Sequence, residues 1–325
     1  MYESLEKLSL VVYIMTMVLG LPANVFVLYV FYKKARSRLT PNLIYMINLC
    51  LSDLLFILFL PVKIIATVKK EWTMPAVLCP VYNFFHFSTI YASVCFLTTV
   101  SIGRYLGTAF PISYKIYKKP RYSCYICIGL WFFVFGHCSF ALVLESNNSM
   151  NTSFFLQQTD EGLQCYENFT QEQLTVIVPV RLELSIVLFF LPLLITVFCY
   201  VRCILILMQS RMHSCQKRKA VRVAVTTVAV FIVCFAPYNV SHVVGFVKWN
   251  TIWWRRMALL PSACNAFLDP LIFYFLSSAV DKGLVHFWKS LQRKYISTKH
   301  HFSSIFEAEP PNSKPQPVRA VSLTI

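Results

Sequence analysis

Charged residues are scarce in this sequence, and acidic ones are the scarcest. Of 325 residues, 57% are hydrophobic and only 14% are charged. Soluble domains carry about 25% charged residues, so this composition excludes an ordinary soluble domain. The chain has 30 Lys and Arg against 14 Asp and Glu, a formal charge of +16. That excess is compatible with nucleic acid or with anionic membrane, and the positions of the charges decide between them.

Long stretches lack charge altogether. A helix needs about 20 apolar residues to cross the hydrocarbon core of a bilayer. Seven stretches meet this length, and apart from their ends the only charges in them are Asp53, Arg181, Glu183 and Asp269. The first has neither the basic start nor the cleavage site of a signal peptide, so we expect a retained anchor. The predicted spans are residues 8–32, 42–66, 77–104, 122–144, 176–201, 223–247 and 257–279.

The loops give the orientation. Those after the first, third and fifth spans contain Lys and Arg but no acid, whereas residues 145–175 contain acids and no base. The positive-inside rule therefore predicts cytoplasmic odd loops and an extracellular N-terminus, and we expect the plasma membrane as location. Glycosylation sequons at Asn147, Asn151 and Asn168 all lie in the acidic loop, as expected outside the cell. The basic charge then faces membrane lipid and cytosolic partners, and no nucleic acid is predicted.

The 12 cysteines do not indicate a disulfide framework, because most lie inside predicted spans. Cys79, at the outer end of the third span, and Cys165, in the acidic loop, are both on the oxidising side. We predict that they form a disulfide, the alternative being two free thiols. No nucleophile elbow or zinc signature organises the polar residues, so we do not expect an enzyme.

The chain changes character after the seventh span. Residues 280–295 carry apolar side chains at helical spacing with basic ones between them, which predicts a short amphipathic helix on the inner membrane face. Residues 296–325 are rich in Ser, Thr, Pro and Lys, which is typical of a disordered cytoplasmic tail. The predicted fold is all-α. It comprises an extracellular N-terminus (1–7), a seven-transmembrane helix bundle (8–279), the amphipathic helix and the tail.

Short motifs at fixed places in these spans resemble the rhodopsin-like (class A) G-protein-coupled receptors over about residues 8–295. They include Gly20-Leu-Pro-Ala-Asn24 in the first span, Cys234-Phe-Ala-Pro237 in the sixth and Asp269-Pro-Leu-Ile-Phe-Tyr274 in the seventh. The resemblance implies a heterotrimeric G protein, arrestin and receptor kinases as partners. It also implies an activation switch formed by Asp53, Ser93, Arg104, Pro237, Asp269 and Tyr274.

Three residues of that switch predict an ion site. Asp53, Ser93 and Asp269 resemble the family's pocket for an allosteric sodium ion, which would relieve repulsion between the acids; the alternative is a structural hydrogen-bonded pair. No other cofactor is implied.

Gly103 stands where family members carry Asp or Glu, so Arg104 lacks an adjacent carboxylate. We expect raised basal signalling, the alternative being that other contacts hold Arg104.

Arg181 is a charge inside a predicted membrane helix. Glu183, two residues on, points to another helix face and does not explain it. In a seven-helix bundle, Arg181 and Arg255 are expected to reach one outer cavity. Two guanidiniums repel each other unless an anion joins them, and each binds a carboxylate with two hydrogen bonds, which predicts a small carboxylate ligand. The alternative for Arg181 is a snorkelling anchor. The other side chains expected in this cavity are Tyr238, His242, His137 and Tyr91.

Further motifs narrow the resemblance to the short-chain free fatty acid receptors. They include Phe135-Gly-His137-Cys138, Pro179-Val-Arg181-Leu-Glu-Leu184 and Trp253-Trp-Arg255. The resemblance implies that Arg181 and Arg255 bind the carboxylate of acetate, propionate or butyrate, with Gi/o and Gq/11 as G-protein classes. We also expect Glu167, in the outer loop, to occupy one of the arginines when no ligand is bound. Other anions (lactate, a nucleotide, a longer fatty acid) and a carboxylate transporter stay open.

Overall fold

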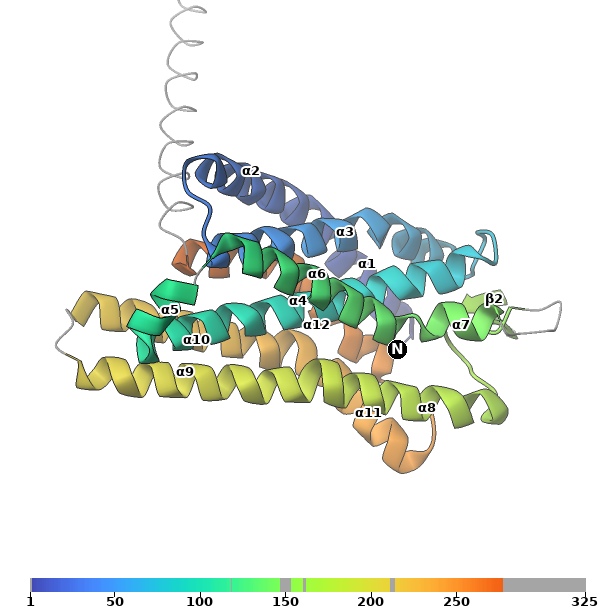
Figure 1. Cartoon of the computed structure of the whole chain (residues 1–325). Coiled ribbons are helices and arrows are strands. Elements are labelled where there is room, and N and C mark those ends of the chain that lie inside the picture. The colour runs from blue at the N-terminus through green and yellow to red at the C-terminus, as the bar shows by residue number, and fades with distance from the viewer. Residues whose placement is uncertain (1, 118, 147–152, 160–161, 211–213, 277–325) are drawn as a thin grey trace, which may run out of the picture. The chain divides into compact units, whose positions relative to one another are not determined.

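The computed structural model describes residues 2–117, 119–146, 153–159, 162–210 and 214–276 (Figure 1). These residues form long helices and one short β-hairpin, as the all-α prediction requires. The first half contains α1 (Tyr2–Met15), η1 (Thr16–Gly20), α2 (Leu21–Ser37), α3 (Pro41–Lys69), α4 (Leu78–Ala109), α5 (Pro111–Tyr117), α6 (Pro120–Cys138) and α7 (Phe140–Ser146). The second contains β1 (Leu156–Thr159), β2 (Gly162–Cys165), α8 (Gln171–Ser185), η2 (Ile186–Phe190), α9 (Leu191–Gln209), α10 (Ser214–Val230), η3 (Phe231–Phe235), α11 (Ala236–Lys248) and α12 (Arg255–Leu276).

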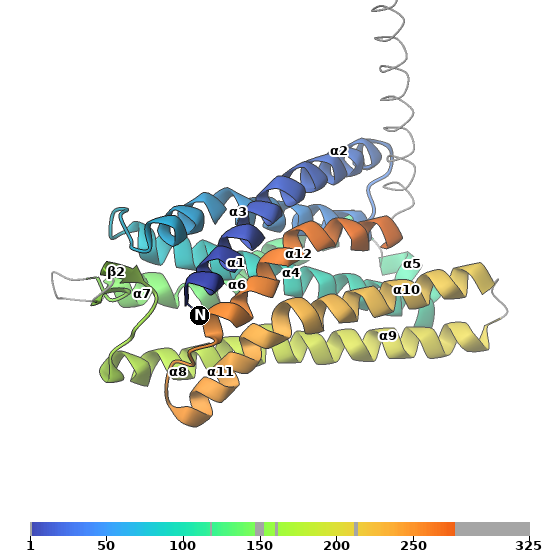
Figure 2. The ribbon, with the colours of Figure 1, turned by 180° about the vertical axis from the view of Figure 1, so that it is seen from behind.

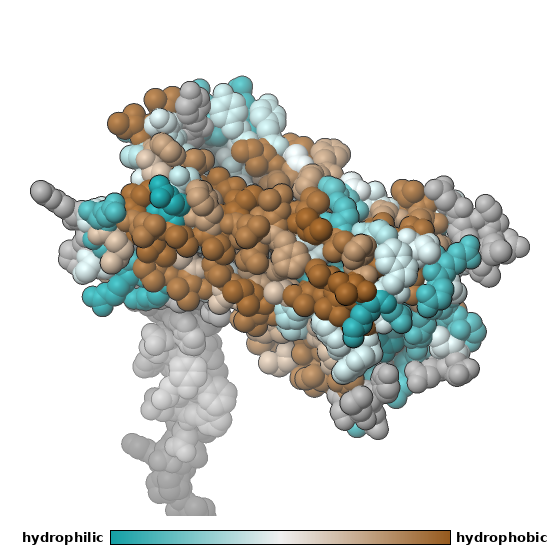
Figure 3. Space-filling model, turned by 90° about the horizontal axis from the view of Figure 1, so that it is seen from below, coloured by the Kyte–Doolittle hydropathy of each residue, from teal (hydrophilic) through white to brown (hydrophobic). Residues whose placement is uncertain are grey.

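Length and hydropathy identify the membrane helices among the described residues. Five continuous helices are long and apolar enough to cross a bilayer, and α6 with α7, bent by 43°, makes a sixth. The seventh helix of the bundle is α12, which lies beside α1 and α2 (Figure 2). Figure 3 shows hydrophobic side chains spread over the middle of one face and hydrophilic ones towards its ends. Outward-facing Phe132 is 75% exposed and Leu194 68%, as expected for side chains in contact with lipid.

Several predicted features lie outside the described residues. These are the amphipathic helix (280–295), the tail (296–325), and the sequons at Asn147 and Asn151, while the side chain of Tyr274 is also outside the description. Asn168 is described, and its side chain is exposed at the extracellular end.

Three π-helical turns interrupt the membrane helices among the described residues, and each ends two residues before a proline. η1 precedes Pro22, η2 precedes Pro192 and η3 precedes Pro237. Proline has no N–H to donate and its ring clashes with the carbonyl four residues earlier, so a widened turn relieves the contact. The outer segments α8 and α11 are therefore aimed separately from α9 and α10.

The helices are held by dense packing and a few polar ties. The central α4 is almost wholly buried: Phe96 has no exposed surface and Leu97 1%. Lipid is as apolar as these side chains, so close packing and interhelical hydrogen bonds carry the association. Trp131 Nε1 on α6 donates to Asn48 Oδ1 on α3 at 3.1 Å, and Ser52 Oγ donates to the Thr89 carbonyl at 2.8 Å.

The extracellular hairpin is tied to the bundle at two points. The predicted disulfide Cys79–Cys165 is present and joins α4 to the end of β2. The Trp72 N–H donates to the Leu163 carbonyl at 2.6 Å, which ties the loop after α3 to the same strand. The residues that follow Cys165 are thereby held over the outer end of the bundle.

Candidate functional site

Four of the predicted ligand-binding residues come together near the extracellular end. Arg181 on α8 is 4% exposed and Arg255 at the start of α12 is 8% exposed. Tyr238 and His242, one turn apart on α11, are buried with ring centroids 4.3 Å apart. Three different helices thus supply two guanidiniums, a phenol and an imidazole to one buried region.

The ring of Tyr166, the residue after the disulfide, lies against both arginines. Its centroid is 5.0 Å from Cζ of Arg181 and 5.4 Å from Cζ of Arg255. Phe169 also lies 5.0 Å from Cζ of Arg181. Aromatic faces attract cations, so these rings stabilise guanidiniums that would otherwise repel each other.

Much of the hydrogen-bonding capacity of the two arginines is unused. Arg255 Nη2 donates to the Tyr166 carbonyl at 3.1 Å, and Arg181 Nη1 makes a long contact of 3.5 Å with Thr251 Oγ1. Arg181 Nε and Nη2, and Arg255 Nε, are buried without a partner within the described ranges. No carboxylate in those ranges lies within ion-pair distance of either arginine. Buried charged donors without acceptors are costly, and a carboxylate would satisfy them.

Two compartments meet at Arg255. One, of about 150 Å³, lies among α1, α3, α4, β2 and α12, and is named here the outer cavity. Tyr166 and Tyr238 line it together with Arg255. The other, of about 10 Å³, is lined by Arg181, His242 and Arg255 and is named here the arginine pocket. The arginine pocket is water-sized, so a larger anion would need the Tyr166 ring to move.

His137 and Tyr91 lie elsewhere than in this cluster. His137 Nδ1 contacts Glu183 Oε1 at 2.8 Å, which links α6 to α8 with both side chains partly exposed. The Tyr91 hydroxyl donates to Asn239 Oδ1 at 3.3 Å. Neither His137 nor Tyr91 lines either compartment. The rotation of α6 about its axis points the His137 side chain towards Glu183. Tyr91 lies one turn of α4 deeper in the bundle than the cluster.

Phe87 takes the place expected for Tyr91. It is one turn nearer the outside on α4, lines the outer cavity, and stacks on Tyr238 with centroids 5.9 Å apart. Its ring also lies 5.2 Å from that of Tyr166. The sequence carried no signal for Phe87 among 28 phenylalanines. The signal for Tyr166 was its position next to a bridging cysteine, which fixes its backbone.

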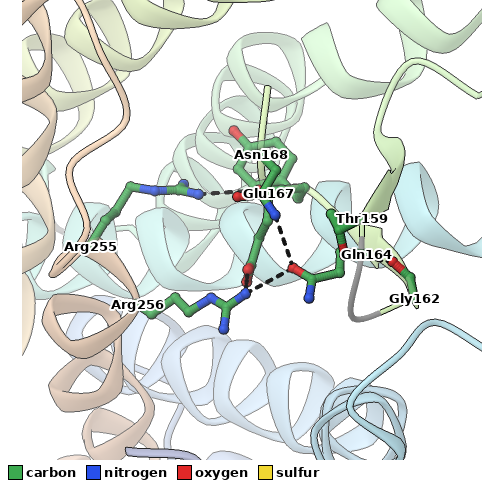
Figure 4. A network of polar contacts seen from close by, with 8 residues as sticks. Thr159, Gly162, Gln164, Glu167, Asn168, Arg255 and Arg256 are labelled. Carbon is green, nitrogen blue, oxygen red and sulfur yellow. Dashed lines mark hydrogen bonds and ion pairs between the residues drawn. The ribbon is translucent and has the colours of Figure 1, made fainter. Parts of the chain in front are cut away.

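Glu167 pairs with an arginine, although not with one of the two in the cluster. Its carboxylate contacts the Arg256 guanidinium, and Gln164 Oε1 accepts from Arg256 Nη2 at 3.0 Å (Figure 4). Asn168 Nδ2 completes the network by donating to Gln164 Oε1 at 3.4 Å. Arg256 is therefore held by the extracellular loop.

Comparison with known proteins identifies the fold and its class. Residues 23–273 match the family profile of the 7 transmembrane receptor (rhodopsin family). Free fatty acid receptor 2 of Mus musculus is 42% identical over 281 residues, covering 86% of this chain and 84% of that protein. The chain belongs to the free fatty acid receptor family of G-protein-coupled receptors. Free fatty acid receptor 3 of Mus musculus is 40% identical over 269 residues, covering 82% of each chain, and free fatty acid receptor 1 of that species is 35% identical over 286 residues, covering 86% and 94%.

The family membership confirms three expectations from the sequence. The protein is a receptor and not an enzyme, it is a multi-pass protein of the plasma membrane, and its N-terminus is extracellular. The cluster around Arg181 and Arg255 therefore lies on the side of the receptor from which an extracellular ligand arrives.

Deeper in the receptor, two buried acids face each other across α3 and α12. Asp53 is 2% exposed and Asp269 has no exposed surface. Ser93 Oγ donates to Asp53 Oδ1 at 3.4 Å, and Asn265 Nδ2 donates to Asp269 Oδ2 at 3.0 Å. Asp53 Oδ2 and Asp269 Oδ1 accept no hydrogen bond from another described residue, and the two carboxyl groups lie within hydrogen-bonding reach of each other. Two buried carboxylate oxygens beside a hydroxyl are a donor set that fits a small hard cation.

At the inner end, Gly103 allows close approach of neighbouring polar groups. A Cβ at this position would lie 3.1 Å from Asn42 Oδ1 and 3.2 Å from the Tyr114 hydroxyl. Partial burial, with Tyr45 nearby, raises the pKa of Tyr114 above its usual value, so its hydroxyl keeps its proton. Arg104 Nε is buried without a partner, and no described carboxylate lies within ion-pair distance of this arginine.

Proposed function

We propose that this receptor is activated by short-chain carboxylates such as acetate, propionate and butyrate, bound through Arg181 and Arg255. The observation that carries the proposal is the pair of buried guanidiniums on α8 and α12 with three unpartnered nitrogens beside one aromatic ring. The names of the relatives, free fatty acid receptors 2 and 3, support a free fatty acid as the ligand. Signalling through Gi/o and Gq/11 is part of the proposal.

The carboxylate bridges α8 and α12 and takes the place of the Tyr166 ring between the guanidiniums. Tyr238 and His242, on the face of α11 that meets the arginines, donate to the remaining lone pairs of the carboxylate. The bridge favours the active state only as far as that state binds it more tightly. Because α11 begins at the η3 turn before Pro237, a shift of α11 is transmitted to the inner segment α10, where the G protein docks beside Arg104.

The size of the ligand limits its affinity. The best small ligands gain about 1.5 kcal/mol per heavy atom, so the five heavy atoms of propionate give at most about 7.5 kcal/mol, or a Kd of a few micromolar. Displacing Tyr166 from both arginines costs part of that. We expect potencies from about ten micromolar to millimolar, suited to an abundant metabolite.

A ligand panel tests the proposal. G-protein activation is measured in membranes with sodium acetate, propionate, butyrate, hexanoate and decanoate, lactate and a nucleotide, at matched receptor amounts. The expected result is activation by the acids of two to five carbons. A response only to decanoate, lactate or the nucleotide would assign another anion. Labelled propionate uptake without G-protein activation would indicate a transporter.

The proposal also includes the accessory partners. Sodium at Asp53, Ser93 and Asp269 would stabilise the resting receptor, arrestin and receptor kinases would act on the active one, and Asn168 would be glycosylated. Raising sodium from zero at constant ionic strength should then lower ligand-free activity.

Glu167→Ala should raise propionate potency about threefold, because it removes a negative charge from the lining of the outer cavity and releases Arg256. The measurement is a concentration–response curve for G-protein activation. Glu172→Ala, which removes an exposed acid from the start of α8, is the matched control and should leave potency unchanged. Equal curves for the wild type and Glu167→Ala would contradict the role of this pair.

Gly103→Glu should lower ligand-free activity severalfold, because the new carboxylate can pair with Arg104 and favour the resting state. Gly103→Ala adds the same crowding against Asn42 and Tyr114 without a charge, so it separates steric from electrostatic effects. Basal G-protein activation is compared at equal surface amounts. Equal basal activity in the wild type and Gly103→Glu would show that Arg104 is held by other means.

A further inference from the structure

The outer cavity offers much more space than the arginine pocket and a chemistry of its own. Its volume of about 150 Å³ compares with about 10 Å³ for the water-sized arginine pocket. Arg255 lines both compartments, so a molecule held there by a carboxylate can extend into the outer cavity. Propionate, with a two-carbon tail, leaves most of this volume unused.

Two ion pairs neutralise four of the seven charged side chains around the outer cavity, which leaves Lys63, Arg255 and Glu71 outside those pairs. Its lining includes the basic side chains Lys63, Lys70, Arg255 and Arg256 and the acidic side chains Glu6, Glu71 and Glu167. Lys70 Nζ pairs with Glu6 at 2.9 Å, Arg256 pairs with Glu167, and Glu71 Oε2 packs at the hairpin, 2.8 Å from where a Cβ on Gly162 would lie.

Lys63 and Arg255 have no carboxylate partner in the part of the chain that the structure describes. Lys63 lies in the membrane helix α3, six residues before its end at Lys69. This position is near the outer end of the span, so it is the place of Lys63 in the cavity lining that points to a binding role. With four basic and three acidic side chains, the cavity lining carries an excess of one positive charge.

His86 on α4 adds a hydrogen-bonding group to the same wall. It is 6% exposed, its Nδ1 lies 3.0 Å from the Tyr82 hydroxyl, and its Nε2 is buried without a partner among the described residues. When the Tyr82 hydroxyl donates to Nδ1, the proton of the neutral imidazole is on Nε2, which then donates to an acceptor. An apolar ligand tail would leave this donor and Lys63 without acceptors, at a cost.

We infer that the outer cavity binds the distal carboxylate of a short dicarboxylate, with Lys63 as its counter-ion and His86 as a donor, while the first carboxylate lies on Arg255. This inference rests on the proposed carboxylate site and extends its ligand class from monocarboxylates to diacids. Lys63 and Arg255 both line this cavity, so a second negative charge is favourable there, and the volume of the cavity holds the connecting carbons.

The distal carboxylate site is tested by measuring G-protein activation in membranes. The ligands are malonate, succinate, glutarate and adipate, each compared with its monomethyl ester, and propionate is the reference. Receptors are the wild type, His86→Phe and Lys63→Met, with His86→Gln and Lys63→Arg as variants that keep a donor or the charge. The best diacid should be about tenfold or more potent than its ester on the wild type, since charge-assisted hydrogen bonds contribute most. The difference should vanish in His86→Phe and Lys63→Met and return in Lys63→Arg, with propionate potency within about twofold throughout.

Esters as potent as their diacids on a receptor that responds to propionate would overturn this inference and leave the proposed function standing. Variants that weaken propionate as much as the diacid would also overturn it, because the effect would not be local to the distal carboxylate. Silence to propionate, with a diacid response that needs His86, would overturn the proposed monocarboxylate function and keep the distal site.

Discussion

Arg181→Ala greatly weakens the propionate response, raising the half-maximal concentration at least about thirtyfold. Removing one partner of a buried, hydrogen-bonded charge pair costs about 2–5 kcal/mol or more, which corresponds to about thirtyfold to several thousandfold in affinity. Arg181 is 4% exposed and two of its nitrogens have no partner among the described residues, so its bonds to a carboxylate would form away from bulk water. The measurement is a propionate concentration–response curve for G-protein activation in membranes.

The chain provides matched controls for this variant. Arg256→Ala removes the same side chain from the neighbour of Arg255, but Arg256 is 45% exposed and pairs with Glu167, so potency should change by no more than about threefold. Arg181→Lys keeps the charge but loses the two parallel hydrogen bonds, and should fall between the wild type and Arg181→Ala. Equal losses for Arg181→Ala and Arg256→Ala at normal surface amounts would show that the arginine cluster does not select the ligand.

Cys165→Ser both destabilises the receptor and removes its propionate response. The disulfide closes a loop with a sequence separation of 86 residues, and losing such a bridge costs about 2–5 kcal/mol. Tyr166 follows Cys165 directly and contacts both arginines, so the loop that organises the site loses its anchor. The thermal midpoint of solubilised receptor and the response of intact membranes are measured side by side.

Cys79→Ser should match Cys165→Ser, and the double variant should be no worse than either, because one bond is lost in all three. Cys124→Ser is the control, since Cys124 is a free, exposed cysteine on α6. Additive losses in the double variant would show that the two cysteines act independently and not through their bond.

The Tyr166 ring, which lies against both arginines, explains how a receptor can keep two buried cations in one region. Tyr166 supplies a carbonyl to Arg255 and a ring face to both guanidiniums, which reduces their repulsion. These contacts are weaker than ion pairs with a carboxylate, so an arriving anion can replace them. The resting cluster is therefore stable enough to persist and weak enough to yield to a small ligand.

The sequence by itself determined the features that depend on local pattern. Apolar length gave the spans, the asymmetry of Lys and Arg gave the orientation, and compartment and position paired Cys79 with Cys165. Arg181 was recognisable because a charge within an apolar helix stands out. Tyr238 and His242 were placed on one face because they are four residues apart.

Only the tertiary structure decided which side chains share a cavity. Tyr91 and Phe87 lie on the same face of α4, but one turn, about 5.4 Å of depth, puts Phe87 at the cavity and Tyr91 against Asn239. His137 faces Glu183 instead of the cluster because the rotation of α6 about its axis is set by its neighbours. Spacing along one helix fixes a face and a depth, whereas contact between helices depends on their rotation, tilt and π turns, which packing against the other helices determines.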